Sequence, residues 1–272
     1  MIKKFSKVVT KCQISNSKKL ESLIFLGYLP PVNTLRKIGS AFEEEISFPA
    51  ELLYCKKSKL AQLGCIVDKE ILFPYSYPYT SSTTKILREN FSDLYKETKK
   101  IIYLRSKDLV IDIGSNDGNL LSNFKDSHKV LGVTPEKIGK LAIKKGIPTI
   151  IDYFDDKTVK KILSKHGKAK IITATNVFAH IDNINQIVKN VLRTLDNDGI
   201  FITESHYLLP LIKTVQYDTI YHEHLRYYSL ESLKYFFSKF NLKIFHAKKI
   251  QTHGGSIRVY ATKNKNYKIN KS

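Results

Sequence analysis

The chain has 272 residues, of which 42% are hydrophobic and 11% aromatic, and its formal net charge is +20. This composition excludes a disordered chain and is typical of one large α/β domain with a smaller appendage. The basic residues are scattered and form no arginine-rich block, so they give a general positive field that suits an anionic ligand. No aromatic–basic pattern indicates nucleic-acid binding.

The three cysteines, Cys12, Cys55 and Cys65, are too few for a disulfide framework and favour a reducing compartment. The first residues lack the apolar region of a signal peptide, and the apolar stretches are too short to cross a bilayer. We therefore expect a cytoplasmic protein that binds no membrane. The sequence does not indicate an oligomeric state.

Residues 1–84 contain short apolar clusters separated by prolines and glycines, which predicts a small N-terminal domain of strands and loops. A helix is predicted over residues 83–104, and strands and helices then alternate. The predicted strands cover residues 108–114, 129–135, 147–154, 169–178, 199–207, 240–250 and 256–263, with helices over 136–146, 157–167 and 183–195. This alternation indicates a doubly wound α/β domain over residues 85–263, followed by a basic tail over 264–272.

The first of these strands ends in a glycine turn with the spacing D-x-G-x-x-x-G. Ligands of open α/β sheets bind at the carboxyl ends of strands, and glycines allow the backbone to approach them. The spacing differs from the G-x-G-x-x-G of dinucleotide binders, and an acidic residue at the strand end suits the ammonium and sulfonium of S-adenosylmethionine. We therefore expect cofactor contacts from Asp112, Gly114, Ser115, Asn116, Gly118 and Asn119; the alternative is a structural turn.

Two further segments follow predicted strands. Asp152, Tyr153 and Phe154 are candidates to flank adenine, with core packing of the aromatic rings as the alternative. Asn176 lies where its amide can meet the cofactor or the substrate, or can cap the next turn.

The run YDTIYHEHLRYYS, residues 217–229, places two histidines beside a glutamate. Adjacent residues point to different sides of a helix or strand, so H-E-H is a poor metal chelate and lacks the H-E-x-x-H spacing. A solvent-facing loop is a second interpretation. The third is catalytic, with His224 as a general base and Tyr221 or Glu223 orienting the base or the substrate.

Four segments carry a family resemblance: VIDIGSNDGNLL, ITATNVFAHI, YDTIYHEHLRYYS and HGGSIRVYATK. With LGYLPPVN, LAQLG and ILFPYSYPYTSS nearer the N-terminus, they resemble the C-methyltransferases that act on nucleotide-linked deoxysugars. The resemblance implies a class I, Rossmann-like methyltransferase fold, S-adenosylmethionine as cofactor and a nucleotide-linked sugar as substrate. It also implies that His224 is the base, that Tyr221 and Glu223 support it, and that His180 lies in the sugar site.

The implied chemistry is methyl transfer to carbon 3 of a 4-keto sugar, where His224 removes an acidified hydrogen and an enolate accepts the methyl group. Residues that we expect to contact the substrate are Tyr75, Tyr77, Tyr79, Ser81, Ser82, His222, His253, Gly254 and Arg258. Arg258 is expected to meet a phosphate or to form a surface ion pair. The alternatives are a sugar O- or N-methyltransferase and a non-catalytic relative that binds polyanions.

The sequence departs from the family pattern at three places. Family members usually bind zinc through two C-x-x-C pairs, but here these read Cys12 to Ser15 and Cys55 to Ser58, and serine hydroxyls are poor zinc ligands. We therefore expect no metal, with apolar packing in its place. The resemblance also implies a further C-terminal region, so we expect either a short member that closes its site differently or a protein whose remaining part lies outside this sequence. Finally, Thr134 replaces the acidic residue that normally binds the ribose, with Glu136 close by.

Overall fold

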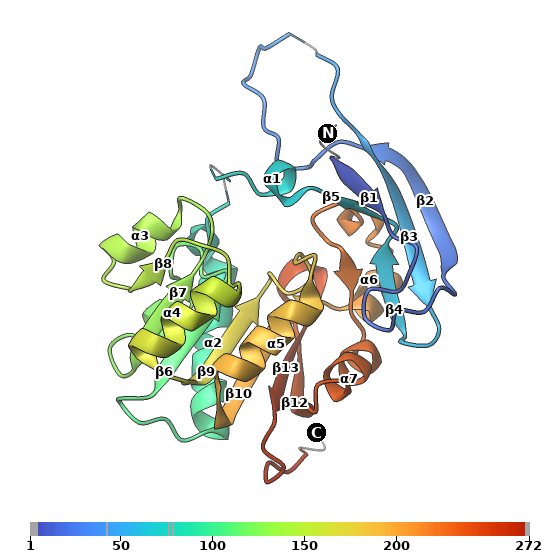
Figure 1. The fold of residues 1–272 in the computed structure, drawn as a ribbon. Helices are drawn as coiled ribbons and strands as arrows, with labels where there is room; N and C mark the ends of the chain where they lie inside the picture. The colour runs from blue at the N-terminus through green and yellow to red at the C-terminus, as the bar shows by residue number, and fades with distance from the viewer. Residues whose placement is uncertain (1–4, 42, 76, 78, 270–272) are drawn as a thin grey trace.

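The computed structural model describes residues 5–41, 43–75, 77 and 79–269, which form two units built on separate sheets (Figure 1). The central sheet has the strand order β12-β13-β10-β9-β6-β7-β8. Its parallel strands are β6 (Leu109–Ile113), β7 (Lys129–Val133), β8 (Thr149–Ile150), β9 (Ala169–Thr175) and β10 (Leu195–His206). The hairpin of β12 (Lys243–Ile250) and β13 (Ser256–Thr262) adds two antiparallel strands beside β10. All the predicted strands are present.

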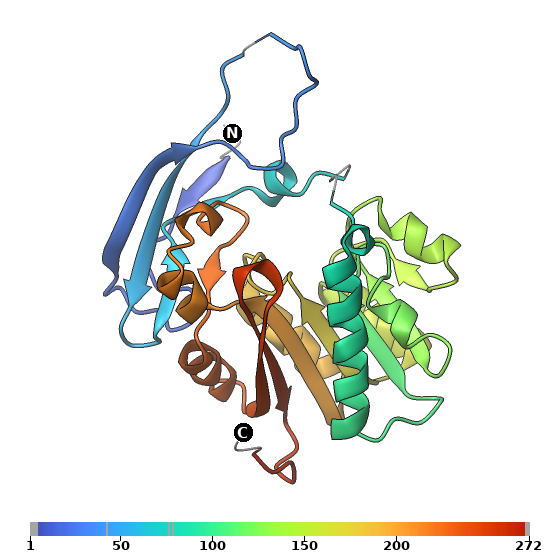
Figure 2. The ribbon, with the colours of Figure 1, turned by 180° about the vertical axis from the view of Figure 1, so that it is seen from behind.

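Helices cover both faces of this sheet, which is why every residue of β6 is buried. One face carries α4 (Asp156–His166), α5 (Ile184–Thr194) and α7 (Leu230–Ser238), and the other carries α2 (Lys85–Ile101) (Figure 2). A short helix, α3 (Gly139–Lys144), lies beside β8. The doubly wound fold predicted from the alternating pattern is confirmed.

Local signals explain where the helices begin. Asp155 caps α4 by accepting a hydrogen bond from the amide of Thr158 at 2.8 Å. A capping box between Ser229 and Ser232 begins α7, a helix that the sequence pattern did not predict. Another unpredicted helix is α6 (Leu208–Lys213), which follows β10.

The N-terminal unit is a four-stranded sheet with the order β11-β4-β3-β2. Its strands β2 (Glu21–Leu29), β3 (Phe48–Cys55) and β4 (Leu60–Leu63) are joined by β11 (Arg226–Tyr227), which comes from the other end of the chain. A separate pair, β1 (Ser6–Val8) with β5 (Cys65–Val67), leads to α1 (Lys69–Leu72). The two units are therefore joined by a strand as well as by the linker before α2.

The four positions of the degenerate zinc motif lie together in the N-terminal unit. The thiol of Cys12 is 3.1 Å from the hydroxyl of Ser58, and the thiol of Cys55 is 3.4 Å from that of Ser15. Both thiols are buried. Both cysteines belong to an apolar core cluster with Ile14 and Leu60, as the expectation of apolar packing requires, and thiol–hydroxyl hydrogen bonds join the four side chains in two pairs.

This donor set does not fit zinc, which in structural sites takes four thiolate or imidazole ligands. No group of three or more histidine, cysteine, aspartate or glutamate residues is arranged to hold a metal within the part of the chain described. Among the helices described, none is long and apolar enough to cross a membrane.

Candidate active site

A cavity of about 1310 Å³ lies at the carboxyl ends of β6, β9 and β10, where the N-terminal unit meets the central sheet. Its wall on the sheet side includes Asp112, Gly114 and Asn176, and its wall on the other side includes Asn33, Tyr77 and Tyr79. This position, at the ends of the central parallel strands, is where open α/β sheets bind their ligands.

The glycine turn after β6 brings backbone to the cavity. Gly114 has φ +73°, and a Cβ added there would lie 2.9 Å from the side chain of Val177. Gly118 has φ +79°, and its added Cβ would lie 2.6 Å from Ile147. Only glycine fits both the backbone angle and the space.

Two polar side chains near this turn, Asp112 and Ser115, do not use all of their hydrogen-bonding capacity within the described residues. The carboxylate of Asp112 lines the cavity, and its hydrogen bond comes from the hydroxyl of Thr173 at 2.6 Å. Burial raises the pKa of Asp112 to about 7, so a bound cation would favour its charged form. The buried hydroxyl of Ser115 has no hydrogen-bond partner among the described residues. The hydroxyl of Ser115 lies against Gly132 of β7, so Asp112 is the group that fits the ammonium of an amino-acid ligand.

The end of the second parallel strand differs from the prediction in one residue. Thr134 is fully buried outside the cavity wall and hydrogen-bonds the carboxylate of Glu136, which does line the cavity. Glu136, rather than Thr134, is therefore the group available to a ribose. Asp152, Tyr153 and Phe154 all line the cavity, and the amine of Lys69 lies 3.5 Å from the centre of the Tyr153 ring.

Ser81, in the linker before α2, is hydrogen-bonded to three residues of the glycine turn. The amide of Ser81 donates to Asn116 at 2.9 Å, and its hydroxyl donates to Asp117 at 2.7 Å. Asn119 donates in turn to the carbonyl of Ser81 at 3.2 Å. Gly118 and Asn119 do not line the cavity, so their role is to support the turn, and the sequence pattern had not singled out Asp117.

The imidazole of His224 lies in the cavity wall with its tautomer fixed. Its Nδ1 is 2.9 Å from the carbonyl oxygen of Thr219, which can only accept, so Nδ1 carries the hydrogen. The neutral ring therefore keeps a lone pair on Nε2. Burial lowers the pKa of His224 to about 3, and the side chain is 3% exposed. The solvent-facing loop is excluded for this residue.

Other rings surround His224. Tyr221 lies 4.1 Å away, His180 5.1 Å and His206 4.3 Å, measured between ring centres. Burial lowers the pKa of His180 and of His206 to about 3 as well. His206 is the last residue of β10, and only its position at a strand end could have indicated it from the sequence.

Glu223 does not contact this base. Its carboxylate accepts hydrogen bonds from Asn33 at 2.6 Å and from the hydroxyl of Tyr77 at 2.9 Å. Burial raises the pKa of Glu223, and these two donors partly offset the rise. Glu223 therefore positions Tyr77 and the loop that carries Asn33, a residue that the sequence analysis missed.

Four substrate candidates lie outside the cavity wall: Tyr75, Ser82, His222 and Arg258. His222 is buried against the N-terminal sheet, with Nε2 3.2 Å from the carbonyl of Pro49 and its ring 5.8 Å from that of Phe48. Because His222 and His224 point to different partners, a chelate between them is excluded. Tyr75 is 55% exposed at the surface. Tyr77, Tyr79, Ser81, His253 and Gly254 do line the cavity, as does Asn176.

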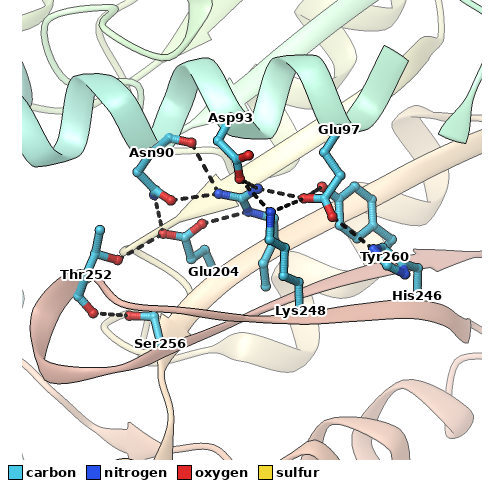
Figure 3. Close-up of polar contacts among 10 residues, drawn as sticks. Asn90, Asp93, Glu97, Glu204, His246, Lys248, Thr252, Ser256 and Tyr260 are labelled. Atoms are coloured by element: carbon cyan, nitrogen blue, oxygen red, sulfur yellow. Dashed lines mark hydrogen bonds and ion pairs between the residues drawn. The ribbon is translucent and has the colours of Figure 1, made fainter. Parts of the chain in front are cut away.

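Arg258 was expected to meet a phosphate or to form a surface ion pair, and both predictions are wrong. Its side chain is fully buried and donates to Glu204 at 2.9 Å, to Glu97 at 2.8 Å and to Asn90 at 2.7 Å. Figure 3 shows these partners between α2 and the hairpin of β12 and β13. Burial alone would lower the pKa of Arg258, but the charge of Glu204 raises it. Arg258 stabilises the fold and is not available to a phosphate.

Comparisons with known proteins agree with this geometry. Residues 85–247 match a methyltransferase domain family, and residues 12–73 match a putative zinc binding domain. The C-methyltransferase NovU from Streptomyces niveus is 30% identical over 255 residues, which cover 93% of this chain and 60% of the relative. The chain thus spans about three fifths of that relative's length.

Solved structures share the fold at low identity. Magnesium protoporphyrin IX methyltransferase from Synechocystis with bound SAH is 13% identical, with a TM-score of 0.51 over 65% of this chain and 83% of that one. An S-adenosylmethionine-dependent methyltransferase from Anabaena variabilis is 15% identical, with a TM-score of 0.50 over 66% and 85%. The match over residues 85–247, on a Rossmann-like sheet whose glycine turn opens into the cavity, shows that the chain belongs to the S-adenosylmethionine-dependent methyltransferases.

Proposed function

We propose that the protein methylates carbon 3 of a nucleotide-linked 4-keto deoxysugar, with His224 as the general base. The observation that carries the proposal is the fixed tautomer of His224 in a cavity that also contains the glycine turn. The carbon nucleophile forms when a proton is removed from carbon 3, and this requires a neutral base with a free lone pair. The 30% identity to a C-methyltransferase also supports carbon as the acceptor.

The cofactor residues follow from the wall of the cavity. Asp112 and the backbone of the glycine turn would hold the amino-acid end of S-adenosylmethionine, and Glu136 would bind its ribose. Tyr153 and Phe154 would flank the adenine. When bound there, the cofactor supplies a methyl group that is activated for transfer by a sulfonium.

The remaining residues act on the sugar. His224 Nε2 takes the hydrogen of carbon 3 while Nδ1 stays bonded to the carbonyl of Thr219. Burial raises the pKa of Tyr221, so its hydroxyl keeps its proton and can donate to the enolate oxygen. Tyr77 is less suited to that task because its hydroxyl donates to Glu223. His180 lines the same wall beside His224 and is available to the sugar hydroxyls.

The test combines product analysis with hydrogen exchange. The protein is incubated with S-adenosylmethionine and a panel of nucleotide-linked sugars with and without a 4-keto group, and mass spectrometry locates the new methyl group. In a parallel reaction in deuterated water, S-adenosylhomocysteine replaces the methyl donor, and exchange at carbon 3 is followed by NMR. Wild type should methylate carbon and exchange this hydrogen.

The matched variants are His224→Ala and His222→Ala. His224→Ala should lose about 10²- to 10⁴-fold in methylation rate and should no longer exchange the hydrogen. His222→Ala should keep most of both, since its ring faces Pro49 and Phe48 outside the cavity. Methylation of a sugar without a ketone would instead identify an O- or N-methyltransferase. Polyanion binding with no methylation across the panel would support the non-catalytic alternative.

A further inference from the structure

A row of three histidines leads from the inside of the cavity to its mouth. His224 is 3% exposed, His206 is half-buried, and His253 is exposed at the turn between β12 and β13. The ring centres of His224 and His206 lie 4.3 Å apart, and those of His206 and His253 lie 5.7 Å apart. All three side chains line the cavity.

The turn that carries His253 is held in a strained backbone conformation. His253 has φ 53° and ψ 44°, a left-handed conformation that is uncommon for residues other than glycine. Such strain persists only where the surroundings fix it, and it is concentrated at functional sites. Here Gln216 donates to the carbonyl of Gly254 at 2.8 Å, and the amide of Tyr207 donates to Gly255 at 3.1 Å.

The buried hydrogen-bond network in Figure 3 also holds the turn that carries His253. Thr252 lies 3.5 Å from the carboxylate of Glu204, and Ser256 donates to the carbonyl of Thr252 at 3.0 Å. Glu204 is two residues before His206 on β10. One rigid cluster therefore positions the backbone of both His206 and His253.

A base at His224 needs an exit for the proton that it takes. Each methyl group transferred to carbon breaks one C–H bond and leaves that hydrogen on Nε2 of His224. Burial disfavours the charged imidazolium, and no carboxylate is hydrogen-bonded to this ring within the described residues. His180 is the other imidazole beside His224, and its further ring neighbour is the apolar Phe73.

We propose that His206 and His253 carry the proton from His224 to solvent, which rests on the proposed role of His224 as base. The proton leaves Nε2 of His224 for a nitrogen of His206, directly or through one water, and passes on to His253 and bulk water. His224 passes on from Nε2 the proton that it took there, and His206 and His253 each release one proton for the one that they accept, so all three rings return to the neutral state. His206 and His253 thus act after the substrate C–H bond has broken.

The test uses His206→Gln, which keeps a polar side chain, and His253→Asn, because asparagine tolerates the left-handed backbone. In weak buffer both variants should lose steady-state turnover, His206→Gln by about tenfold or more, while the first turnover stays within about twofold of wild type. Added imidazole should restore turnover. Exchange of the carbon 3 hydrogen with deuterated water, measured with S-adenosylhomocysteine and no methyl donor, should fall in parallel and recover with imidazole.

A structural or substrate-binding role for these histidines gives a different pattern. An equal loss in the first and later turnovers, with no recovery in imidazole, would overturn the relay. So would wild-type exchange and turnover in both variants. Failure of the proposed function is separate, because wild type itself would then exchange no hydrogen at carbon 3. His253→Asn, at an exposed position, keeps the test informative if His206→Gln does not fold.

Discussion

Two clusters of buried ionisable side chains meet near the end of β10. The side chains of one cluster are charged and paired, and those of the other are neutral. Around Arg258 every charge has a partner, since Glu204, Glu97 and Asp93 all accept from its guanidinium. Around His224 the rings contact one another, and burial keeps them neutral. The paired cluster lies outside the cavity and stabilises the fold, whereas the neutral rings line the cavity, and perturbed pKa values of this kind are typical of functional sites.

The largest expected effect in this comparison is on the paired cluster. Arg258→Met should lower the free energy of unfolding by about 3–5 kcal/mol, because it leaves the buried carboxylate of Glu204 without its cation. Activity per folded molecule should fall much less than in His224→Ala, since Arg258 does not line the cavity and acts on it only through the turn that carries His253. Urea unfolding and a rate corrected for the folded fraction measure the two quantities.

Lys248→Met is the matched control for this change. Lys248 pairs with Asp93 at 2.8 Å but is 39% exposed, so its loss should lower stability by less than about 1 kcal/mol. If Arg258→Met does not fold, the double variant with Glu204→Gln should recover stability, because the uncompensated charge is then removed. A destabilisation by Arg258→Met no larger than that of Lys248→Met would contradict the comparison.

The next effect is the dependence of stability on pH. Burial lowers the pKa of His180, His206 and His224 from 6.5 to about 3, so between these values the unfolded chain binds more protons than the folded one. Stability should therefore fall as pH is lowered from 6.5, by up to about 1.4 kcal/mol per pH unit for each histidine. Asp112 acts in the opposite sense, because its folded pKa of about 7 lies above the ordinary value.

Burial also lowers the pKa of His222 and of His253 and raises that of Glu223. Five histidines against two carboxyl groups leave a net loss of stability on acidification between pH 6.5 and 5. Urea unfolding across this window measures the slope. His206→Gln should make it shallower, since this variant removes one of the groups that protonate only on unfolding. A slope that is unchanged in His206→Gln would mean that His206 is not held neutral in the folded protein.

The smallest expected effect concerns the cluster of Cys12, Ser15, Cys55 and Ser58. Added zinc should leave the midpoint of thermal unfolding of the wild type unchanged, because two thiols and two hydroxyls are a poor zinc donor set. The double variant Ser15→Cys/Ser58→Cys should bind one zinc ion and unfold at a higher temperature, since the four side chains already lie together. One equivalent of zinc in purified wild type, found by elemental analysis, would contradict the first expectation.

The α/β domain could be predicted from the sequence because its strands are short apolar runs separated by amphipathic helices. One strand of the N-terminal unit and one helix on the central sheet could not. Strand β11 has two residues, too few to give a pattern, and it pairs with a strand far away in sequence. Helix α7 was missed because it is short and its adjacent aromatic residues, Phe236 and Phe237, are both buried against Phe178, which blurs the helical spacing of apolar residues.

Within the site, the sequence predicted the residues that lie beside glycines or in distinctive runs. It did not predict the residues whose place in the site depends on tertiary contacts. His206 ends an ordinary strand, and Asn33 lies in a loop whose contact with Glu223 spans 190 positions. Arg258 was misplaced for the same reason, since its exposure depends on α2 packing against β13. Sequence spacing can place a side chain on an element but cannot show what covers it.

The pairing of β11 with β4 also has a consequence for the order in which the protein forms. Arg226 pairs with Gln62, so 164 residues separate the partners. At a synthesis rate of about 5–20 residues per second, the N-terminal sheet waits about 10–30 s on the ribosome for its last strand. During that time β4 has an unpaired edge to which other chains can add. The same strand begins two residues after His224, so this imidazole reaches its place in the cavity only when that edge is paired.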